Sequence, residues 1–266
     1  MDEVIPKSDL SIDYDFNQHR QKQERKNGFL GQPLGQSFDI DPVRIAILFS
    51  GRGSNMRALA QSIADDILGA ELALTLCNRP DAAGIDYAKT LDVPCAVIDH
   101  THYKTRTAFE DEMQSHLEKE KIDLICAAGF MRLLTPAFVE HWQDRLLNIH
   151  PSLLPHHKGL NTHEAVLAAG DAQHGCTVHY MRPAMDDGPH LVQKSLWVKG
   201  DDTADSLAAR VLELEHIAYR EALPQAIDHI RFGKEQMGYA PIDNGDNGDN
   251  GDSPAYIGLA ERQPKK

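Results

Sequence analysis

Residues 43–60 read VRIAILFSGRGSNMRALA, and this stretch decides the fold. The first seven residues are a near-continuous apolar run of strand length, as expected for a strand buried on both faces. A turn with two glycines, SGRGSN, follows at residues 50–55, and apolar residues at helical spacing continue to residue 67. A buried strand that passes through a glycine turn into a helix is the beginning of a βα unit.

The same alternation of apolar runs and amphipathic segments continues to about residue 231. It is typical of an α/β protein with a mostly parallel sheet flanked by helices, and the last two strands are expected to be antiparallel. Asp202 and Thr203 are suited to cap the last helix. Strands are predicted at residues 43–49, 71–77, 95–98, 123–128, 146–149, 176–181 and 192–198. Helices are predicted at residues 54–67, 82–91, 103–119, 136–142 and 204–230.

The two ends of the chain differ from the middle in composition. Residues 1–41 mix charges, Gln, Gly and Pro without an apolar period, which indicates a flexible N-terminal extension. Residues 233–266 contain three Asn-Gly-Asp repeats and are interpreted as a low-complexity, disordered tail. The repeats lack the closing Glu and the flanking helices of an EF-hand, so a solvated linker is favoured over a calcium site. The folded domain is therefore expected at residues 42–232.

Charge and hydropathy argue against several classes of function. A formal net charge of −13 argues against a nucleic-acid surface, since phosphate backbones require clustered Lys and Arg. The first residues carry neither a basic patch nor an apolar stretch, and no window approaches the roughly 20 apolar residues of a membrane span. We therefore expect a cytoplasmic protein without a nucleic-acid or membrane partner. The four cysteines form no CxxC and lie in apolar runs, which predicts buried reduced thiols.

The glycine turn is a candidate phosphate site. Backbone N–H groups at the start of the following helix would face a ligand above the sheet. Met56 stands where a dinucleotide fingerprint requires its third glycine, and the Lys-Ser/Thr pair of a Walker A loop is missing. One phosphomonoester is therefore favoured over NAD or ATP. A tight turn without a ligand remains the alternative, because two glycines in a βα turn are common.

A second candidate site begins with NIHPSLLP, just after the predicted strand at residues 146–149. Asn148 and His150 are two residues apart, so their side chains should project to the same side. Asn148 can donate to an oxygen that becomes negative, His150 can stabilise charge or move protons, and Asp186 can hold the imidazole tautomer. These three residues, the polar trio, suit the attack of an amine on an acyl carbon. No HExxH motif or His-Cys pair at zinc spacing is present, so no metal is expected.

Six motifs, taken together, resemble the phosphoribosylglycinamide formyltransferase family, the folate-dependent enzymes of purine biosynthesis. They lie within residues 44–223 in the family's order and spacing: SGRGSN, AGFMRLLTPAFV, NIHPSLLP, GLNTHEA, HGCTVHY and DDGP. The resemblance implies a Rossmann-like formyltransferase fold. It also implies that 10-formyltetrahydrofolate is the co-substrate and that its formyl group passes to the amine of glycinamide ribonucleotide. Transfer would proceed directly through a tetrahedral intermediate, without a metal.

The resemblance also assigns roles to residues. Asn148, His150 and Asp186 match the family's catalytic residues, and His179 matches a histidine close to them. The ribonucleotide and its phosphate are assigned to Gly51, Arg52, Gly53, Ser54, Asn55 and Glu215. The folate is assigned to Arg106, Met131, Arg132, Leu133, Leu134 and Asn148.

Three departures from the family pattern stand out. Asn161 replaces a common His, which puts ribose or phosphate contacts in doubt, and residues 156–158 form an unusual His-His-Lys run. Asp187 follows Asp186 where some members have Gly, so either carboxylate could reach His150. Spacing from neighbouring motif residues favours Asp186. We expect His174 to be a surface or turn residue.

Three other functions remain open. Formyltetrahydrofolate deformylase has a similar domain, but it normally carries a regulatory domain in front and lacks the Gly-Leu-x-Thr-His element found at residues 159–163. Methionyl-tRNA formyltransferase requires a basic C-terminal RNA-binding domain where this chain has its Asn-Gly-Asp repeats. A non-catalytic binding protein for folate or a phosphometabolite is the third alternative, and the intact trio argues against it. The sequence does not distinguish a monomer from a homodimer.

Overall fold

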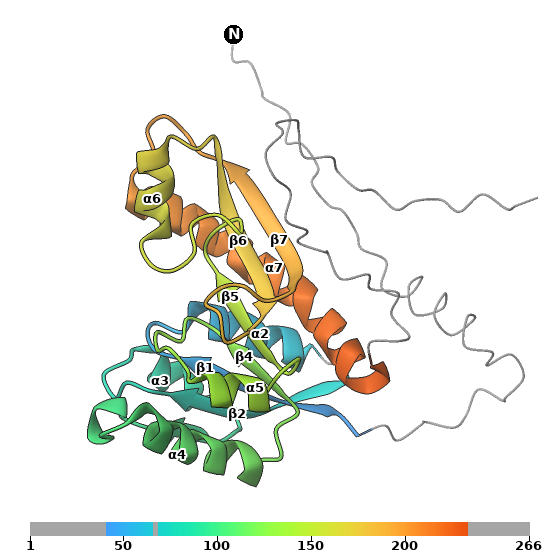
Figure 1. Cartoon of the computed structure of the whole chain (residues 1–266). Coiled ribbons are helices and arrows are strands. Elements are labelled where there is room, and N and C mark those ends of the chain that lie inside the picture. Colours follow the sequence, from blue (N-terminus) through green and yellow to red (C-terminus); the bar gives the residue numbers. More distant parts are fainter. Residues whose placement is uncertain (1–40, 66–68, 234–266) are drawn as a thin grey trace, which may run out of the picture. The chain divides into compact units, whose positions relative to one another are not determined.

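The computed structural model describes residues 41–65 and 69–233. The expected extension and tail lie outside these residues, apart from Asp41 and Gly233, and so stay predictions. The described residues form one seven-stranded sheet of order β3-β2-β1-β4-β5-β6-β7 (Figure 1). Five strands are parallel: β1 (Val43–Phe49), β2 (Ala70–Cys77), β3 (Cys95–Val97), β4 (Leu124–Ala127) and β5 (Leu146–His150). The last two, β6 (Gln173–Tyr180) and β7 (His190–Trp197), are antiparallel, which confirms the predicted fold class.

Helices follow most of the parallel strands. They are α2 (Ser54–Ala64), α3 (Gly84–Ala88), α4 (Arg106–Lys119), α5 (Pro136–His141), α6 (Thr162–Ala169) and α7 (Ala204–Phe232), together with the short 3-10 helix η1 (His100–His102). The predicted helix at residues 82–91 is too long, since α3 spans only five residues. Sequence reasoning missed α6, whose eight residues are too few to show a clear helical period. The predicted cap of α7 is present, because Thr203 accepts a hydrogen bond from the Ser206 N–H.

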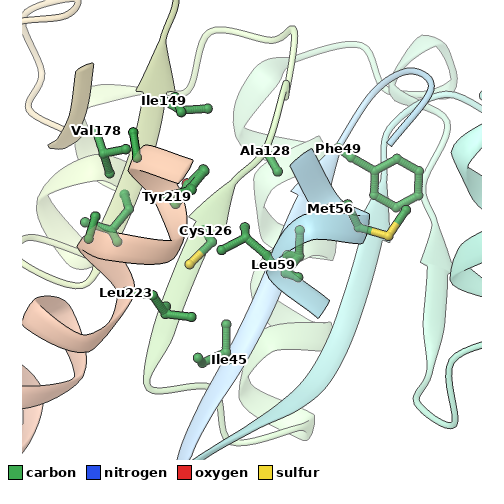
Figure 2. Packing of buried hydrophobic residues seen from close by; sticks show 14 of the residues in the cluster. Ile45, Phe49, Met56, Leu59, Cys126, Ala128, Ile149, Val178, Tyr219 and Leu223 are labelled. Atoms are coloured by element: carbon green, nitrogen blue, oxygen red, sulfur yellow. The ribbon is translucent and has the colours of Figure 1, made fainter. Parts of the chain in front are cut away.

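Both faces of the sheet are covered, and β1 shows why its sequence is apolar throughout. Ile45, Ile47 and Phe49 pack in a first core with α2, α3 and α7, and Figure 2 shows Ile45 and Phe49 in this cluster. Ala46 and Leu48 point the other way and pack in a second core with α4 and α5. Alternate residues of one strand thus enter two different cores.

The topology places the candidate site at one edge of the sheet. The parallel strands end at the same edge, and the sheet changes from parallel to antiparallel between β5 and β6. The antiparallel register sets Asn148 of β5 opposite His179 of β6. Two polar residues distant in the sequence therefore become neighbours on adjacent strands.

The cysteines agree with the sequence prediction in all but one case. All four are free, and Cys77, Cys126 and Cys176 are buried, whereas Cys95 is half-buried. Burial raises the pKa of the Cys176 thiol to about 12, so this group stays protonated at neutral pH. No helix within residues 41–65 and 69–233 is long and apolar enough to cross a membrane.

Candidate active site

The polar trio comes together at the end of β5. Asn148 and His150 lie on the same side of the strand as Leu146, which packs in the second core. Asp186 reaches them from the loop between β6 and β7, with its Oδ2 atom 3.5 Å from His150 Nδ1. The side chains of His150 and Asp186 are only 7% and 10% exposed, so water screens this contact weakly. The structure therefore brings together the three residues that the sequence singled out.

Backbone groups of residues 157–159 hold the His150–Asp186 pair. The Nε2 atom of His150 lies 3.0 Å from the carbonyl oxygen of His157 and donates to it, because a carbonyl can only accept. The N–H of Gly159 donates to Asp186 Oδ2 over 2.9 Å. Asp186 itself adopts a φ of 52°, a left-handed conformation that is uncommon for a residue with a side chain. The segment 157–159 is thus a clamp around the imidazole and its carboxylate.

His179 fixes the orientation of the Asn148 amide. Its Nδ1 atom donates to the carbonyl of Tyr180 over 3.0 Å, and burial lowers the pKa of the ring to about 4. The ring is therefore neutral near pH 7 and presents Nε2 as an acceptor. Asn148 Nδ2 lies 3.4 Å from this atom, so one amide hydrogen faces His179 and the second is available to a ligand oxygen.

The structure resolves which of the two adjacent carboxylates meets His150. Asp186 faces the imidazole, whereas the exposed Asp187 forms an ion pair with Lys158. Two of the departures from the family pattern, Lys158 and Asp187, thus partner each other. Lys158 and Gly159 are successive residues of the clamp, and they contact Asp187 and Asp186, two successive residues of the loop after β6.

The glycine turn at residues 51–55, called the glycine loop from here on, leads from β1 into α2. Gly53 has a φ of 72° and precedes the helix without a side-chain capping bond, so no side chain occupies the N–H groups of the first turn. A Cβ atom at Gly51 would meet nothing within 4 Å, which leaves the approach to this turn open. Such a helix start can receive an anion.

Asn55 and Glu215 form a buried pair that links the glycine loop to α7. Asn55 Nδ2 donates to Glu215 Oε2 over 2.6 Å, and both residues are at least nine-tenths buried. Burial raises the pKa of the Glu215 carboxyl, and the hydrogen bond from Asn55 opposes this shift. Asn55 Oδ1 has no hydrogen-bond partner among the described residues, so it can accept from a bound ligand. The structure thus brings together two residues that lie far apart in the sequence.

The segment 131–134 lies beyond the end of β4 and presents apolar side chains to solvent. Met131 is 73% exposed and Leu133 57%, whereas Leu134 packs against the second core. The Arg132 guanidinium lies 5.3 Å from the ring centre of Phe109, and its Nε has no hydrogen-bond partner in the described part of the chain. Arg106 is exposed and is the first residue of α4, the helix that also carries Phe109.

His174 is not the surface residue that was expected. It is 1% exposed on β6, and its Nε2 atom lies 2.9 Å from Nδ1 of His163 on α6. Burial lowers the pKa of His174 to about 4. The prediction failed because the missed helix α6 covers this end of the strand. In the part of the chain that the structure describes, no group of three or more His, Cys, Asp or Glu could hold a metal ion.

Sequence reasoning missed two kinds of contributor. The peptide groups of residues 157–159 carry no signal in the sequence beyond the glycine at 159. Ser50 directly follows β1 and Asn78 directly follows β2. Each is at most 4% exposed, and they hydrogen-bond to each other over 2.5 Å. Their positions directly after buried parallel strands were the available signal, because that is where strand ends meet a ligand cleft.

Comparison with known proteins gives a consistent result. The family described as formyl transferase matches residues 43–223. The chain is 36% identical over 177 residues to phosphoribosylglycinamide formyltransferase of Escherichia coli, covering 66% of this chain and 84% of that protein. It is 41% identical over 198 residues to the trifunctional purine biosynthetic protein adenosine-3 of Gallus gallus, covering 74% of this chain. That alignment covers only 19% of the trifunctional protein, so the chain spans about a fifth of the length of such relatives.

A solved structure is also similar to this chain. Phosphoribosylglycinamide formyltransferase from Coxiella burnetii superposes with a TM-score of 0.65 at 43% sequence identity. The match covers 69% of this chain and 86% of that one. The family match at residues 43–223 includes the glycine loop and the polar trio.

Proposed function

Because this chain belongs to the formyl transferase family, we propose that it transfers the formyl group of 10-formyltetrahydrofolate to the amine of N1-(5-phospho-D-ribosyl)glycinamide. The products are the N-formyl ribonucleotide and tetrahydrofolate, in IMP biosynthesis. The observation that carries the proposal is the buried contact between His150 and Asp186 beside Asn148, at the sheet edge where the glycine loop also lies. These groups suit acyl transfer to an amine, because they supply donors for the oxyanion, an imidazole that can move protons and a carboxylate that orients it.

In the proposed reaction the amine nitrogen attacks the formyl carbon, and the carbonyl electron pair moves to the oxygen. The free Asn148 Nδ2 hydrogen donates to that oxygen as it becomes negative, while the His150 imidazole stabilises the same charge. In the described conformation His150 Nε2 donates to the His157 carbonyl, so a substrate oxygen gains this second donor by displacing that carbonyl. Asn148 is therefore the donor that is ready before any movement.

Asp186 has two tasks in this scheme. Its carboxylate beside Nδ1 holds the orientation of the His150 ring. It also lies where it can direct a water molecule that carries a proton from the attacking nitrogen to the folate nitrogen. When the bond between the formyl carbon and the folate nitrogen breaks, that nitrogen takes up the proton and tetrahydrofolate leaves. The balance closes without a metal or a covalent enzyme intermediate.

The two substrates are assigned to different regions of the protein. The open N–H groups at the start of α2, together with Gly51, Arg52, Gly53 and Ser54, suit the ribonucleotide phosphate. Asn55 and Glu215 lie next to this loop, and the free Asn55 Oδ1 and the Glu215 carboxylate suit the polar glycinamide part. The exposed Met131 and Leu133 with the basic Arg132 and Arg106 suit a flat apolar pterin with an acidic tail.

We further propose that the protein acts in the cytoplasm on small molecules, as a monomer or a homodimer, without a nucleic-acid or membrane partner. The net charge of −13 supports the absence of a nucleic-acid partner, since such a field repels phosphate backbones.

One assay tests the activity. Purified full-length chain is incubated with 10-formyltetrahydrofolate, with and without glycinamide ribonucleotide, and the folate absorbance is followed while formate and formylated ribonucleotide are quantified. Turnover that requires the amine and yields its N-formyl product is expected. Formate release without the amine would instead identify a formyltetrahydrofolate deformylase, and no turnover in either arm would identify a binding protein.

A further inference from the structure

Ser50 connects the two segments that are assigned to the two substrates. It is the residue after β1 and immediately precedes the glycine loop, and it is only 4% exposed. Its Oγ atom accepts the N–H of Met131 over 2.7 Å, at the start of segment 131–134. Its own N–H donates to the carbonyl of Gly129 over 3.1 Å. A single buried serine therefore fastens the segment after β4 to the end of β1.

Asn78 orients the Ser50 hydroxyl. The hydroxyl donates to Asn78 Oδ1 over 2.5 Å, which turns an oxygen lone pair toward the Met131 N–H. Asn78 is 1% exposed and follows β2, and its carbonyl lies 2.8 Å from His100 Nδ1 beyond β3. Segments that follow four neighbouring parallel strands are thus joined by one chain of hydrogen bonds, of which the Ser50–Asn78 bond is buried and the others are partly buried.

We propose that Ser50 is a positioning residue, which holds segment 131–134 at the distance from the glycine loop at which formylfolate and ribonucleotide meet beside Asn148. The identity of the two substrates rests on the proposed function, whereas the hydrogen bonds of Ser50 do not depend on it.

Side-chain packing does not replace this hydrogen bond. The Met131 side chain is 73% exposed, so the start of the segment is held through its backbone rather than through a buried side chain. Loss of the Ser50 hydroxyl would leave the Met131 N–H and Asn78 Oδ1 without partners, and the segment would then shift to regain them. A shift of about 1 Å in a segment that orients a substrate can reduce turnover on the order of 10²-fold, so a smaller shift of the segment should reduce it about 10-fold.

The test compares Ser50→Ala with Ser62→Ala, in the full-length chain. Ser62 is a matched control, because it is also a buried serine and donates to the Ala58 carbonyl within α2. Ser50→Ala is expected to lower kcat about 10-fold and to raise the KM for formylfolate, while the KM for the ribonucleotide changes less than about 2-fold. Ser62→Ala should leave all three constants unchanged. Equal effects of the two substitutions on kinetics would contradict the proposal.

A double-mutant cycle tests the role of Asn78. If Asn78 acts through Ser50, the double variant Ser50→Ala with Asn78→Ala should be no slower than Ser50→Ala alone, within about 2-fold. Fully multiplicative losses would show that the two residues act separately.

A measurement without substrate separates this inference from the proposed function. Amide hydrogen exchange at Met131 should be about 10-fold faster in Ser50→Ala than in the unsubstituted chain, and unchanged in Ser62→Ala. This result stands even if the assay with glycinamide ribonucleotide shows no turnover. Unchanged exchange at Met131 would overturn the positioning role whatever the reaction is.

Discussion

The β1–α2 region and the β5–β7 region both contribute to the candidate site, but they are built on different principles. In the first, a regular strand and helix present backbone N–H groups, and only Gly53 requires a left-handed conformation. In the second, side chains from β5 and a loop meet within a backbone clamp. His157, Asn161 and Asp186 all have positive φ there, at 51°, 57° and 52°. The comparison teaches that regular elements are enough to leave a helix start open, whereas the contact between an imidazole and a carboxylate here involves several left-handed residues.

Strain of this kind has a consequence for stability. A left-handed non-glycine residue costs roughly 1 kcal/mol, so the surrounding contacts must outweigh it. In the β5–β7 region those contacts include the His157–Asp171 pair at 2.6 Å and the Gly159 N–H bond to Asp186. We therefore expect the second region to respond more strongly than the first to substitution and to pH.

The largest effect is expected from His150→Ala in the second region. Removing the imidazole, and with it one oxyanion donor, should lower kcat by on the order of 10²–10³ and leave the fold intact. The measurement is steady-state kinetics in the formyl transfer assay. His102→Ala, at a side chain that is 78% exposed on η1, is the control and should change nothing. Near-normal turnover of His150→Ala would remove the trio from the mechanism.

The second effect is a loss of stability at acid pH that originates in β6. Burial lowers the pKa of His174 and of His179 from 6.5 to about 4, so the unfolded chain takes up these protons at a higher pH than the folded one. Their contribution to the free energy of unfolding is complete above about pH 6.5. It is lost as the pH falls toward 4, at about 1.4 kcal/mol per pH unit for each histidine. Urea unfolding between pH 7.5 and 4.5 measures this slope.

A control variant makes the pH experiment specific. His174→Gln removes one of the two histidines whose pKa is lowered to about 4, and it should reduce the loss of stability between pH 6.5 and 4. His102→Gln should keep the full slope, because that side chain is largely in solvent. An unchanged slope in His174→Gln would place the acid sensitivity elsewhere in the molecule.

A smaller effect is expected from Gly53→Ala in the first region. At a φ of 72° the new Cβ would lie 2.6 Å from Met56 Cε and 3.2 Å from Gly84 Cα, so both strain and crowding result. We expect about 1–2 kcal/mol of destabilisation and a higher KM for the ribonucleotide, measured by urea unfolding and kinetics. Gly170→Ala has the same φ and open space around it, so it isolates the strain alone and should not alter KM.

The smallest effect is expected at the exposed ion pair between Lys158 and Asp187. Exposed pairs contribute little, so Lys158→Asp or Asp187→Lys alone should lower kcat only about 2–3-fold, by loosening the clamp. The double exchange restores opposite charges and should recover most of this loss. Failure to recover would mean that the pair does not position the clamp.

The sequence predicted the first region more completely than the second, for a physical reason. The strand 43–49 matched β1 at both ends, because an apolar run of strand length bounded by glycine leaves one interpretation. Asn148 and His150 were also recognised, since residues two apart on a strand share a side. The clamp was not recognised from the sequence. Every residue has a peptide group, and a sequence does not show which of these groups lie close to a given side chain.

Burial of polar residues was the other limit. His174 was misplaced because its burial depends on α6, and Ser50 with Asn78 was overlooked because single serines and asparagines occur throughout the chain. The burial of these polar residues depends on which segments lie next to one another in the fold. That arrangement follows from the order of the strands in the sheet rather than from the local sequence pattern.

The clamp at residues 157–159 has a bearing on how this protein can vary. Its carbonyl and its N–H come from the main chain, so the side chain at 157 supplies neither group, and position 159, with a φ of 86°, favours glycine. What cannot vary is the number of residues between the end of β5 and Gly159, since one insertion or deletion would carry both groups away from the imidazole and the carboxylate. Selection at this segment would therefore act on its length and backbone conformation more than on the chemistry of its side chains.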